Sequence, residues 1–346
     1  MNNYFCVMPF FGAEIVPKLG PVTPCCFLKP NSNIKKIKSE MLQQIRPSEC
    51  SSCWQLEDKG IKSDRQYKNE SFDFYSNKDI TLIEQDCKQG NYSEQIVKLY
   101  TSILCNSTCV TCGPELSSAW ASLNKFKNKS ISISKNFINQ LNYHDLKMLS
   151  FVGGEPLYEK KNFQILDTLS RTGNTNCFIS IVTNGSVKLN KNQIDILTRF
   201  PNLNLCLSID GIESKFEYIR YPLKWQVLLE NLELFRSLNI KLSVSYTISN
   251  LNILYYNEIV SWFEKQQLKY NQNMVSEPEW FSVNSLPSQV KNKLPKETQH
   301  LLRKHLPQDD DNFAKFITQI QLQDNLKNIS INNFMPEVYK MIKENI

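Results

Sequence analysis

The chain has 346 residues, of which 41% are hydrophobic, and 40 Lys and Arg against 34 Asp and Glu leave a net charge of +6. This length suits one large domain and one smaller domain at roughly 100–200 residues per domain. The mild charge and scattered basic residues argue against a nucleic-acid partner. No apolar run approaches the ~20 residues of a membrane span, and the first residues lack the features of a secretion signal. We therefore expect a cytoplasmic protein without a membrane partner.

Cysteine is abundant and histidine is scarce, with 11 cysteines and three histidines in the chain. A disulfide framework is not expected in a reducing compartment, and an odd number of cysteines cannot pair completely. The composition therefore predicts a metal held mainly by thiolates.

Residues 1–95 are expected to be irregular, because six prolines interrupt any long helix or strand. The first part of this region holds five cysteines: Cys6, Cys25, Cys26, Cys50 and Cys53. Four thiolates with this spread could close either a structural zinc site or an iron–sulfur cluster, and the spacing alone does not distinguish the two.

From residue 96 onward, segments with strand and helix patterns alternate. Predicted strands cover 98–104, 149–152, 178–183, 203–209 and 242–248, and predicted helices cover 135–148, 163–170, 193–200 and 227–238. Strands separated by helices of this length predict right-handed crossovers and a parallel sheet. From about Leu294 the chain is expected to be helical, with residues 309–311 as a helix cap.

Two of the predicted strands have one polar face. Residues 203–210 alternate between apolar side chains and a second set that includes Ser208 and Asp210, and residues 242–249 follow the same pattern. A fully packed barrel fills its interior with Val, Ile and Leu. The polar face therefore favours an open or partial barrel with a hydrophilic ligand in its lumen over a sheet that is solvated on one side.

Cys105, Cys109 and Cys112 form a C-x3-C-x2-C motif just after the first predicted strand of this series. Three thiolates on one short loop can hold three corners of a [4Fe-4S] cluster and leave one iron without a protein ligand. A structural zinc ion prefers four ligands, and no fourth Cys or His follows nearby in the sequence. A zinc site that borrows a distant ligand remains an alternative.

The motif and its place in a βα series resemble the signature of the radical SAM superfamily. The resemblance implies that S-adenosylmethionine (SAM) binds the open iron, and that an electron from the cluster cleaves SAM to methionine and a 5′-deoxyadenosyl radical. This radical then abstracts hydrogen from a substrate. Residues at later strand ends resemble the SAM-binding positions of the family: Gly153, Gly154 and Glu155 in a GGEP motif, Asn184, Ser208, Asp210, and Arg220 as partner of the SAM carboxylate. Residues 279–283 resemble the sixth strand.

The N-terminal cysteines, with Cys-x2-Cys-Trp and the later residues 63–65, resemble the twitch domain-containing radical SAM proteins, whose auxiliary-cluster domain is related to SPASM domains. The resemblance implies that Cys6, Cys25, Cys50 and Cys53 ligate a second [4Fe-4S] cluster. Cys26 is a spare thiol that could replace Cys25. We therefore expect an α/β protein with a twitch-like domain in residues 1–95, a partial (β/α)6 TIM-like barrel in residues 96–290 and a helical extension in residues 291–346.

Enzymes of this kind often modify peptides or proteins, so the resemblance implies a peptide or protein side chain as substrate. Radical oxidation or rearrangement of a small metabolite is the alternative. An electron donor such as flavodoxin or ferredoxin is expected. Tyr218 and Cys26 are the candidates for a general base or a hydrogen donor. The alternative from another class is a non-catalytic zinc-binding interaction protein, and the ordered strand-end motifs count against it.

Overall fold

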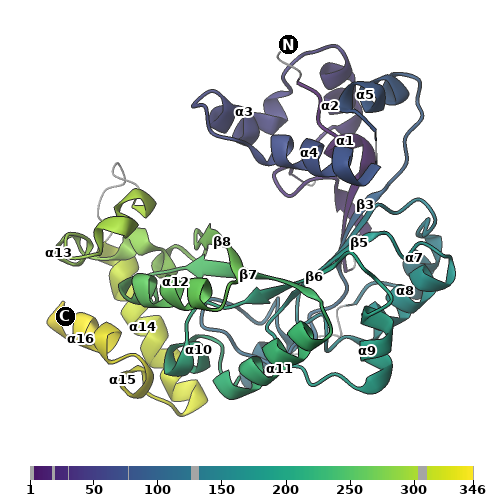
Figure 1. Ribbon diagram of the computed structural model, residues 1–346. Helices are drawn as coiled ribbons and strands as arrows, with labels where there is room; N and C mark the ends of the chain where they lie inside the picture. The colour runs from purple at the N-terminus through teal and green to yellow at the C-terminus, as the bar shows by residue number, and fades with distance from the viewer. Residues whose placement is uncertain are drawn as a thin grey trace. The chain divides into compact units, whose positions relative to one another are not determined.

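The computed structural model describes residues 4–17, 20–29, 31–76, 78–125, 132–302 and 310–345. Its strands form one sheet in the order β2-β1-β3-β4-β5-β6-β7-β8 (Figure 1). Seven of the strands are parallel, and β2 pairs antiparallel with β1. The strands are β1 (Gly12–Val16), β2 (Gly20–Thr23), β3 (Ile96–Tyr100), β4 (Met148–Val152), β5 (Phe178–Thr183), β6 (Leu203–Ser208), β7 (Lys241–Ile248) and β8 (Lys269–Met274). The predicted α/β fold with a partial barrel is confirmed, with β3 to β8 as its six strands.

The chain divides into two compact units. The first unit comprises residues 1–103, 130–181 and 189–204, and the second comprises residues 104–129, 182–188 and 205–346. In the part of the chain that is described, no helix is both long and apolar enough to cross a membrane.

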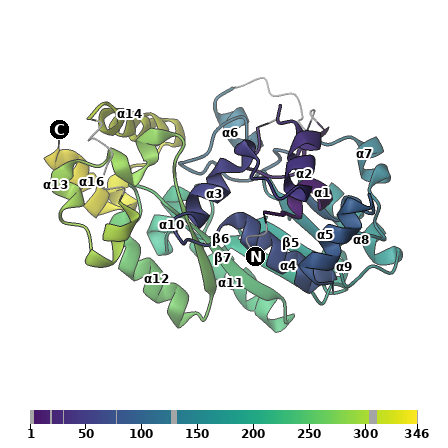
Figure 2. The same cartoon turned by 90° about the horizontal axis from the view of Figure 1, so that it is seen from above.

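The N-terminal part of the first unit is helical, so the expectation of an irregular region is wrong. It contains α1 (Met8–Phe11), α2 (Ile34–Leu42), α3 (Ser51–Glu57), α4 (Asp64–Ser76) and α5 (Ile80–Lys88), which are seen together in Figure 2. The prolines do not prevent these helices, because Pro9 lies in the first turn of α1 and Pro47 precedes a 3-10 turn. Phe5, Phe11 and Ile37 belong to the apolar core of this region.

The N-terminal region contributes a strand to the sheet of the first unit. Strand β1 runs parallel to β3, with Gly12 opposite Ile96 and Ile15 opposite Leu99. Residues on both sides of the expected division between residues 95 and 96 therefore belong to one sheet and one unit. The same unit contains α7 (Lys135–Gln140), α8 (Lys160–Arg171) and α9 (Lys191–Leu197).

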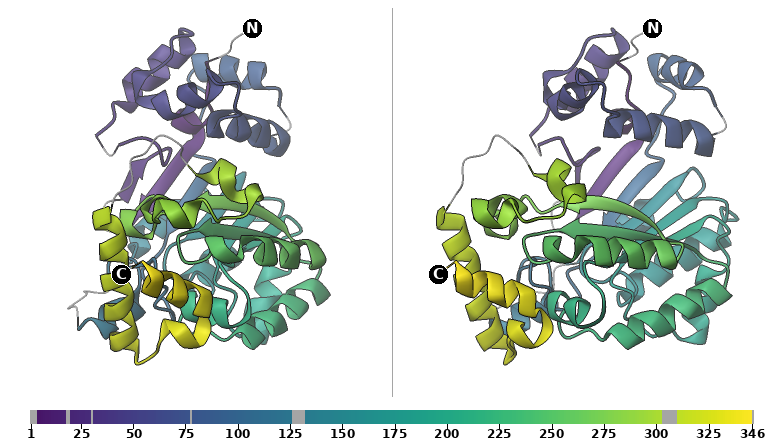
Figure 3. Two further views of the ribbon diagram at one scale, coloured as in Figure 1. Left: turned by 90° about the vertical axis from the view of Figure 1, so that its left-hand side faces the viewer. Right: turned by 60° about the vertical axis from the view of Figure 1, so that its left-hand side comes forward.

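The second unit contains α6 (Ser118–Leu123), α10 (Glu213–Ile219), α11 (Trp225–Ser237), α12 (Tyr256–Lys265), α13 (Ser288–Lys291), α14 (Asp310–Lys327), α15 (Ile331–Phe334) and α16 (Pro336–Glu344). The helical C-terminal region is therefore confirmed, and its last helices contact one another, as Figure 3 shows. Residue 309 of the expected cap lies outside the described residues.

The predicted alternation of β6 and β7 is confirmed. Leu207 and Tyr246 are fully buried, whereas Ser208 and Ser245 on the opposite faces are half-buried. The predicted sixth strand is wrong, because Glu279–Phe281 forms a 3-10 turn and the strand is β8 instead. Most residues of β8 are exposed and polar, so this strand lacks the hydrophobic periodicity that the prediction relied on.

Candidate functional site

Residues 105–112 of the second unit form a loop that we call the cysteine loop. Its three cysteines are half-buried, and the Ser107 hydroxyl lies 3.3 Å from the Sγ atoms of both Cys105 and Cys109. Burial raises the pKa of Cys112 to about 12, and the neighbouring Cys109 thiol adds to this effect. Sulfurs gathered in this way ionise readily only beside a compensating positive charge, such as that of a metal centre.

The backbone of the cysteine loop is fixed by residues on either side of Arg220. Thr108 N donates to Tyr221 O at 2.6 Å, and Val110 N donates to Ile219 O at 2.8 Å. These two bonds hold the middle of the loop against the end of α10. The position of Arg220 is therefore coupled to the position of the cysteines.

Arg220 is held by a buried ion pair and keeps one donor unused. Its Nη2 donates to Asp210 Oδ2 at 2.6 Å, and its Nη1 lies 3.9 Å from Cys109 Sγ. Asp210 is fixed in turn, because its Oδ1 accepts a hydrogen bond from Thr247 N at 2.9 Å. Burial opposes the charge of Arg220, but Asp210 and the Cys109 thiol outweigh it and raise the pKa of the guanidinium. Arg220 Nε is buried without a hydrogen-bond partner among the described residues, which is costly unless a ligand supplies an acceptor.

Asn184 is also tied to the cysteine loop. Its Nδ2 donates to Asn106 Oδ1 at 2.8 Å, and its Oδ1 accepts from the Ser186 hydroxyl at 2.7 Å. Asn106 Nδ2 closes the network by donating to Ser186 Oγ at 2.9 Å. The second unit therefore brings together Asn184, Asp210, Arg220 and the three cysteines, and Ser208 ends strand β6 in the same unit.

The structure adds a residue of α14 that the sequence analysis missed. Lys327 is 6% exposed, and its Nζ lies 4.7 Å from the centre of the Trp120 ring. Trp120 Nε1 donates to Cys109 O at 2.9 Å. Gln323 donates to Val110 O and accepts from Lys327 Nζ, each at 2.9 Å. No local signal marks Lys327, because it is more than 200 positions from the motif and lies on a helix without a diagnostic pattern.

The GGEP motif lies in the first unit, directly after β4. Gly153 and Gly154 have φ angles of +79° and +52°, in the left-handed region that favours glycine. A Cβ atom on Gly153 would lie 3.1 Å from the Tyr100 ring, so the backbone approaches its neighbour closely. Glu155 is 1% exposed, and its Oε1 accepts a hydrogen bond from Leu157 N at 3.0 Å. The carboxylate therefore shapes the turn that presents the two glycines.

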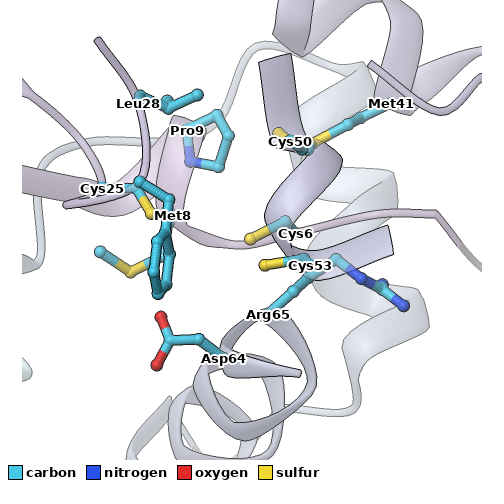
Figure 4. Close-up of a pocket in the computed structure, with 11 residues that line it drawn as sticks. Cys6, Met8, Pro9, Cys25, Leu28, Met41, Cys50, Cys53, Asp64 and Arg65 are labelled. Atoms are coloured by element: carbon cyan, nitrogen blue, oxygen red, sulfur yellow. The ribbon is translucent and has the colours of Figure 1, made fainter. Parts of the chain in front are cut away.

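Four cysteines of the first unit line one cavity (Figure 4). They are Cys6 before α1, Cys25 after β2, Cys50 at the start of α3, and Cys53 within α3. In Figure 4 the sulfurs of Cys6 and Cys53 point toward the side on which Cys25 lies. The other lining residues are Met8, Pro9, Phe27, Leu28, Met41, Asp64 and Arg65, most of which are apolar. The four cysteines predicted as auxiliary ligands therefore do meet at one place.

The environment of these four thiols suits an iron–sulfur cluster. Burial raises the pKa of Cys6 and Cys50 to about 12, so both need a compensating charge to ionise. Backbone hydrogen bonds reach three of the sulfurs: from Met8 to Cys6, from Phe27 to Cys25 and from Arg65 to Cys53. Hydrogen bonds to sulfur and an apolar surround are the means by which proteins tune such clusters.

Arg65 anchors the wall of the cavity next to Cys53. Its Nε and Nη2 donate to the two carboxylate oxygens of Glu57 at 2.9 and 2.8 Å, and its Nη1 donates to Phe5 O at 2.7 Å. The two side chains are only 8% and 11% exposed. A bidentate pair of this kind fixes geometry as well as charge.

The two candidates for a hydrogen-donating side chain lie in different environments. Cys26 is exposed and is not among the described residues that line the four-cysteine cavity. A hydrogen bond with Cys25 and the nearby Lys98 lower the pKa of Cys26 to about 7. Tyr218 is 1% exposed, and its hydroxyl donates to Asp324 Oδ1 at 2.8 Å. Its hydroxyl therefore has a structural partner on α14.

The side chains at each cysteine site determine whether it suits a single metal ion or an iron–sulfur cluster. Among the described residues, no three His, Cys, Asp or Glu side chains are gathered closely enough to hold a single metal ion. A cluster makes a different demand, because each thiolate binds a different iron and the sulfurs stand farther apart. Both cysteine groups, being composed of thiols with few competing oxygen ligands, fit an iron–sulfur cluster.

Residues 99–263 match the family model of the Radical SAM superfamily. This segment of the chain is therefore similar to the radical SAM superfamily, whose members are enzymes. The matched segment begins in β3 and ends in α12, so it contains the cysteine loop, the GGEP motif, Asp210 and Arg220. A search of curated proteins finds no match to the chain.

Solved structures with a similar fold include two proteins with bound SAM. Polyhistidine-tagged anSMEcpe with bound AdoMet is 19% identical over 54% of this chain and 53% of that chain, with a TM-score of 0.41. Streptococcus suis SuiB bound to S-adenosylmethionine is 14% identical over 86% of this chain and 61% of that chain, with a TM-score of 0.43. Streptococcus suis SuiB bound to the precursor peptide SuiA is 14% identical over 85% of this chain and 59% of that chain, with a TM-score of 0.42. The chain thus spans about half to three fifths of the length of these proteins.

Proposed function

We propose that the protein is a radical SAM enzyme that reductively cleaves SAM and abstracts hydrogen from a substrate. The observation that carries this proposal is the arrangement of the cysteine loop beside a buried arginine with an unused Nε donor. Cys105, Cys109 and Cys112 would hold a [4Fe-4S] cluster on this loop. When bound, the cluster supplies the electron that cleaves SAM to methionine and a 5′-deoxyadenosyl radical.

The remaining residues of the proposed site bind and orient SAM. Arg220 would receive the SAM carboxylate, because a guanidinium held by Asp210 presents its remaining N–H groups in a fixed direction. The backbone at Gly153 and Gly154 would approach the amino group without side-chain obstruction. Glu155 would position that turn, Asn184 would fix the cysteine loop, and Ser208 would face the ligand from the polar side of β6.

We propose a second [4Fe-4S] cluster in the first unit, ligated by Cys6, Cys25, Cys50 and Cys53. Support comes from the shared cavity, the backbone hydrogen bonds to sulfur and the apolar lining. A twitch-like auxiliary domain would then be formed by the helices around this cavity. Of the two adjacent cysteines, Cys25 is favoured as the ligand because it lines the cavity whereas Cys26 is exposed.

The proposed substrate is a peptide or protein side chain. Support for a polar or extended substrate comes from the half-buried polar face of β6 and β7 and from the exposed strand β8, whose backbone a peptide could pair with. A small metabolite that undergoes radical oxidation or rearrangement remains the alternative. A flavodoxin or ferredoxin in the cytoplasm would supply the electron, and a reducing compartment suits the eleven cysteines, none of which forms a disulfide.

The SAM cleavage assay tests the main proposal. Anaerobically reconstituted protein is incubated with SAM and dithionite, and 5′-deoxyadenosine is measured by chromatography. We expect 5′-deoxyadenosine from the wild type and none from the Cys105→Ala/Cys109→Ala/Cys112→Ala variant. A folded, iron-loaded wild type that forms no 5′-deoxyadenosine would refute the proposed activity.

Paired cysteine variants test the second cluster. Cys25→Ser should lower the iron content by about four per chain, because a cluster ligand is lost, whereas Cys26→Ser should leave it unchanged. Iron and sulfide analysis after reconstitution measures both. The opposite outcome would assign the ligand to Cys26, and zinc in place of iron at this site would favour a structural zinc domain.

A further inference from the structure

A buried ammonium group near the C-terminal end of the chain is linked to the cysteine loop through two neighbouring side chains, Gln323 and Trp120. Lys327 is the last residue of α14, and it packs over the Trp120 ring, whose Nε1 holds Cys109 O. The Tyr221 ring lies on another side, with its centre 5.9 Å from Lys327 Nζ. Aromatic faces of this kind attract a cation and exclude water from it.

Lys327 forms no ion pair with the described residues. Among the described residues, no carboxylate oxygen lies within 4 Å of its Nζ in an ion pair, and the Nζ donates a hydrogen bond to the neutral Gln323 Oε1 instead. Asp324, the carboxylate that acts electrostatically on Lys327, accepts hydrogen bonds from Tyr218 and from Ile331 N. The positive charge is therefore held in the interior without a neutralising contact, which is costly unless another negative group is present.

Two cysteines of the loop act electrostatically on Lys327. Burial lowers the pKa of Lys327 to about 8, and ionised Cys109 and Cys112, together with Asp324, act in the opposite direction. Gln323 joins this lysine to the loop, because it accepts from Lys327 and donates to Val110 O between the two cysteines. The lysine, the glutamine and the loop thus form one connected unit.

We propose that Lys327 is the buried cation that sets the reduction potential of the cluster on Cys105, Cys109 and Cys112, an inference that rests on the proposed function. Reduction adds one electron to a site that already carries three thiolates. A nearby positive charge stabilises the reduced state more than the oxidised state and so raises the potential, and net charge is one of the main determinants of cluster potential. Because Lys327 is buried, salt screens this effect much less than it screens a surface charge.

The test is a redox titration of the reconstituted full chain, followed by electron paramagnetic resonance. The cluster on the cysteine loop is identified by the change that SAM causes in its signal. Lys327→Met and Lys327→Gln remove the charge, and Lys327→Arg retains it. Lys315→Met is the matched control, because Lys315 is exposed on the same helix.

We expect the midpoint potential of both uncharged variants to be lower than that of the wild type. The equilibrium constant for reduction should fall tenfold or more, which corresponds to about 59 mV for one electron. Lys327→Arg and Lys315→Met should stay near the wild type. The proposal is overturned if the uncharged variants keep the SAM-responsive signal and the wild-type potential. It is also overturned if both fold normally but lose the cluster, which would give Lys327 a role in cluster assembly. A wild type with no SAM-responsive signal would instead refute the proposed function itself.

Discussion

At the scale of single residues, the contacts of Arg220 indicate most clearly that the cysteine loop lies beside a ligand-binding site. One edge of its guanidinium is bound by Asp210, another faces Cys109, and Nε is buried and unused. A buried donor without a partner costs free energy unless a ligand supplies an acceptor. The unused donor, together with the nearby thiols, explains why this arginine is suited to bind a carboxylate.

Arg220→Lys should therefore weaken SAM binding by about tenfold or more, because lysine retains the charge but loses the fixed, planar set of donors. Equilibrium binding of SAM to the reconstituted protein measures this effect. Iron content serves as the control and should match that of the wild type, since Arg220 is not a cluster ligand. Unchanged SAM affinity would show that Arg220 binds only Asp210.

Some residues of the two sites can be predicted from the sequence, and others cannot. The three motif cysteines are predicted from thiol chemistry and spacing, whereas the choice of four N-terminal cysteines rests on the resemblance to twitch domain-containing proteins. Ser107 lies inside the motif, yet its hydroxyl contacts follow from the loop conformation. Lys327 was missed altogether, because its place beside the cysteine loop depends on tertiary packing and leaves no local pattern.

At the scale of elements, α14 is the main support of the cysteine loop from the C-terminal region. It contributes Gln323 and Lys327 to the loop and Asp324 to Tyr218 on α10. The helical pattern of this region was predicted, but its contact with the loop was not. Helical periodicity identifies an apolar face without naming the element that covers it.

Tyr218→Phe should lower the free energy of unfolding by about 1–3 kcal/mol, because it removes the hydroxyl that donates to Asp324 in a largely buried contact. Urea denaturation of the variant and the wild type measures the difference. If stability is unchanged but 5′-deoxyadenosine formation is lost, Tyr218 acts in catalysis and the structural interpretation of its hydroxyl is wrong.

Two further elements show where sequence patterns fail. The sixth strand was predicted at residues 279–283, later in the chain than β8, because an exposed polar edge strand has no hydrophobic alternation. The N-terminal helices were not expected, yet Pro9 lies in the first turn of α1, where the missing amide hydrogen is not needed, and α2 to α5 contain no proline. In contrast, the bounds of β5 were predicted to the residue, since its mostly apolar run, in which every second residue is buried, has clear boundaries.

At the scale of the whole molecule, the two cysteine sites belong to different compact units. The four-cysteine cavity is built entirely by the first unit, and the cysteine loop with Arg220 and Lys327 is built entirely by the second. Each site therefore has its own supporting contacts, such as the Arg65–Glu57 pair in the first unit and the Gln323 bonds in the second. Loss of one site should leave the other intact.

The most direct measurement is the iron and sulfide content of the anaerobically reconstituted chain and of two triple variants. One variant carries alanine at Cys105, Cys109 and Cys112, and the other at Cys6, Cys50 and Cys53. We expect about eight irons and eight sulfides per wild-type chain and about four of each in either variant. A wild type that binds zinc alone, or variants that both lose all iron, would contradict the presence of two independent clusters.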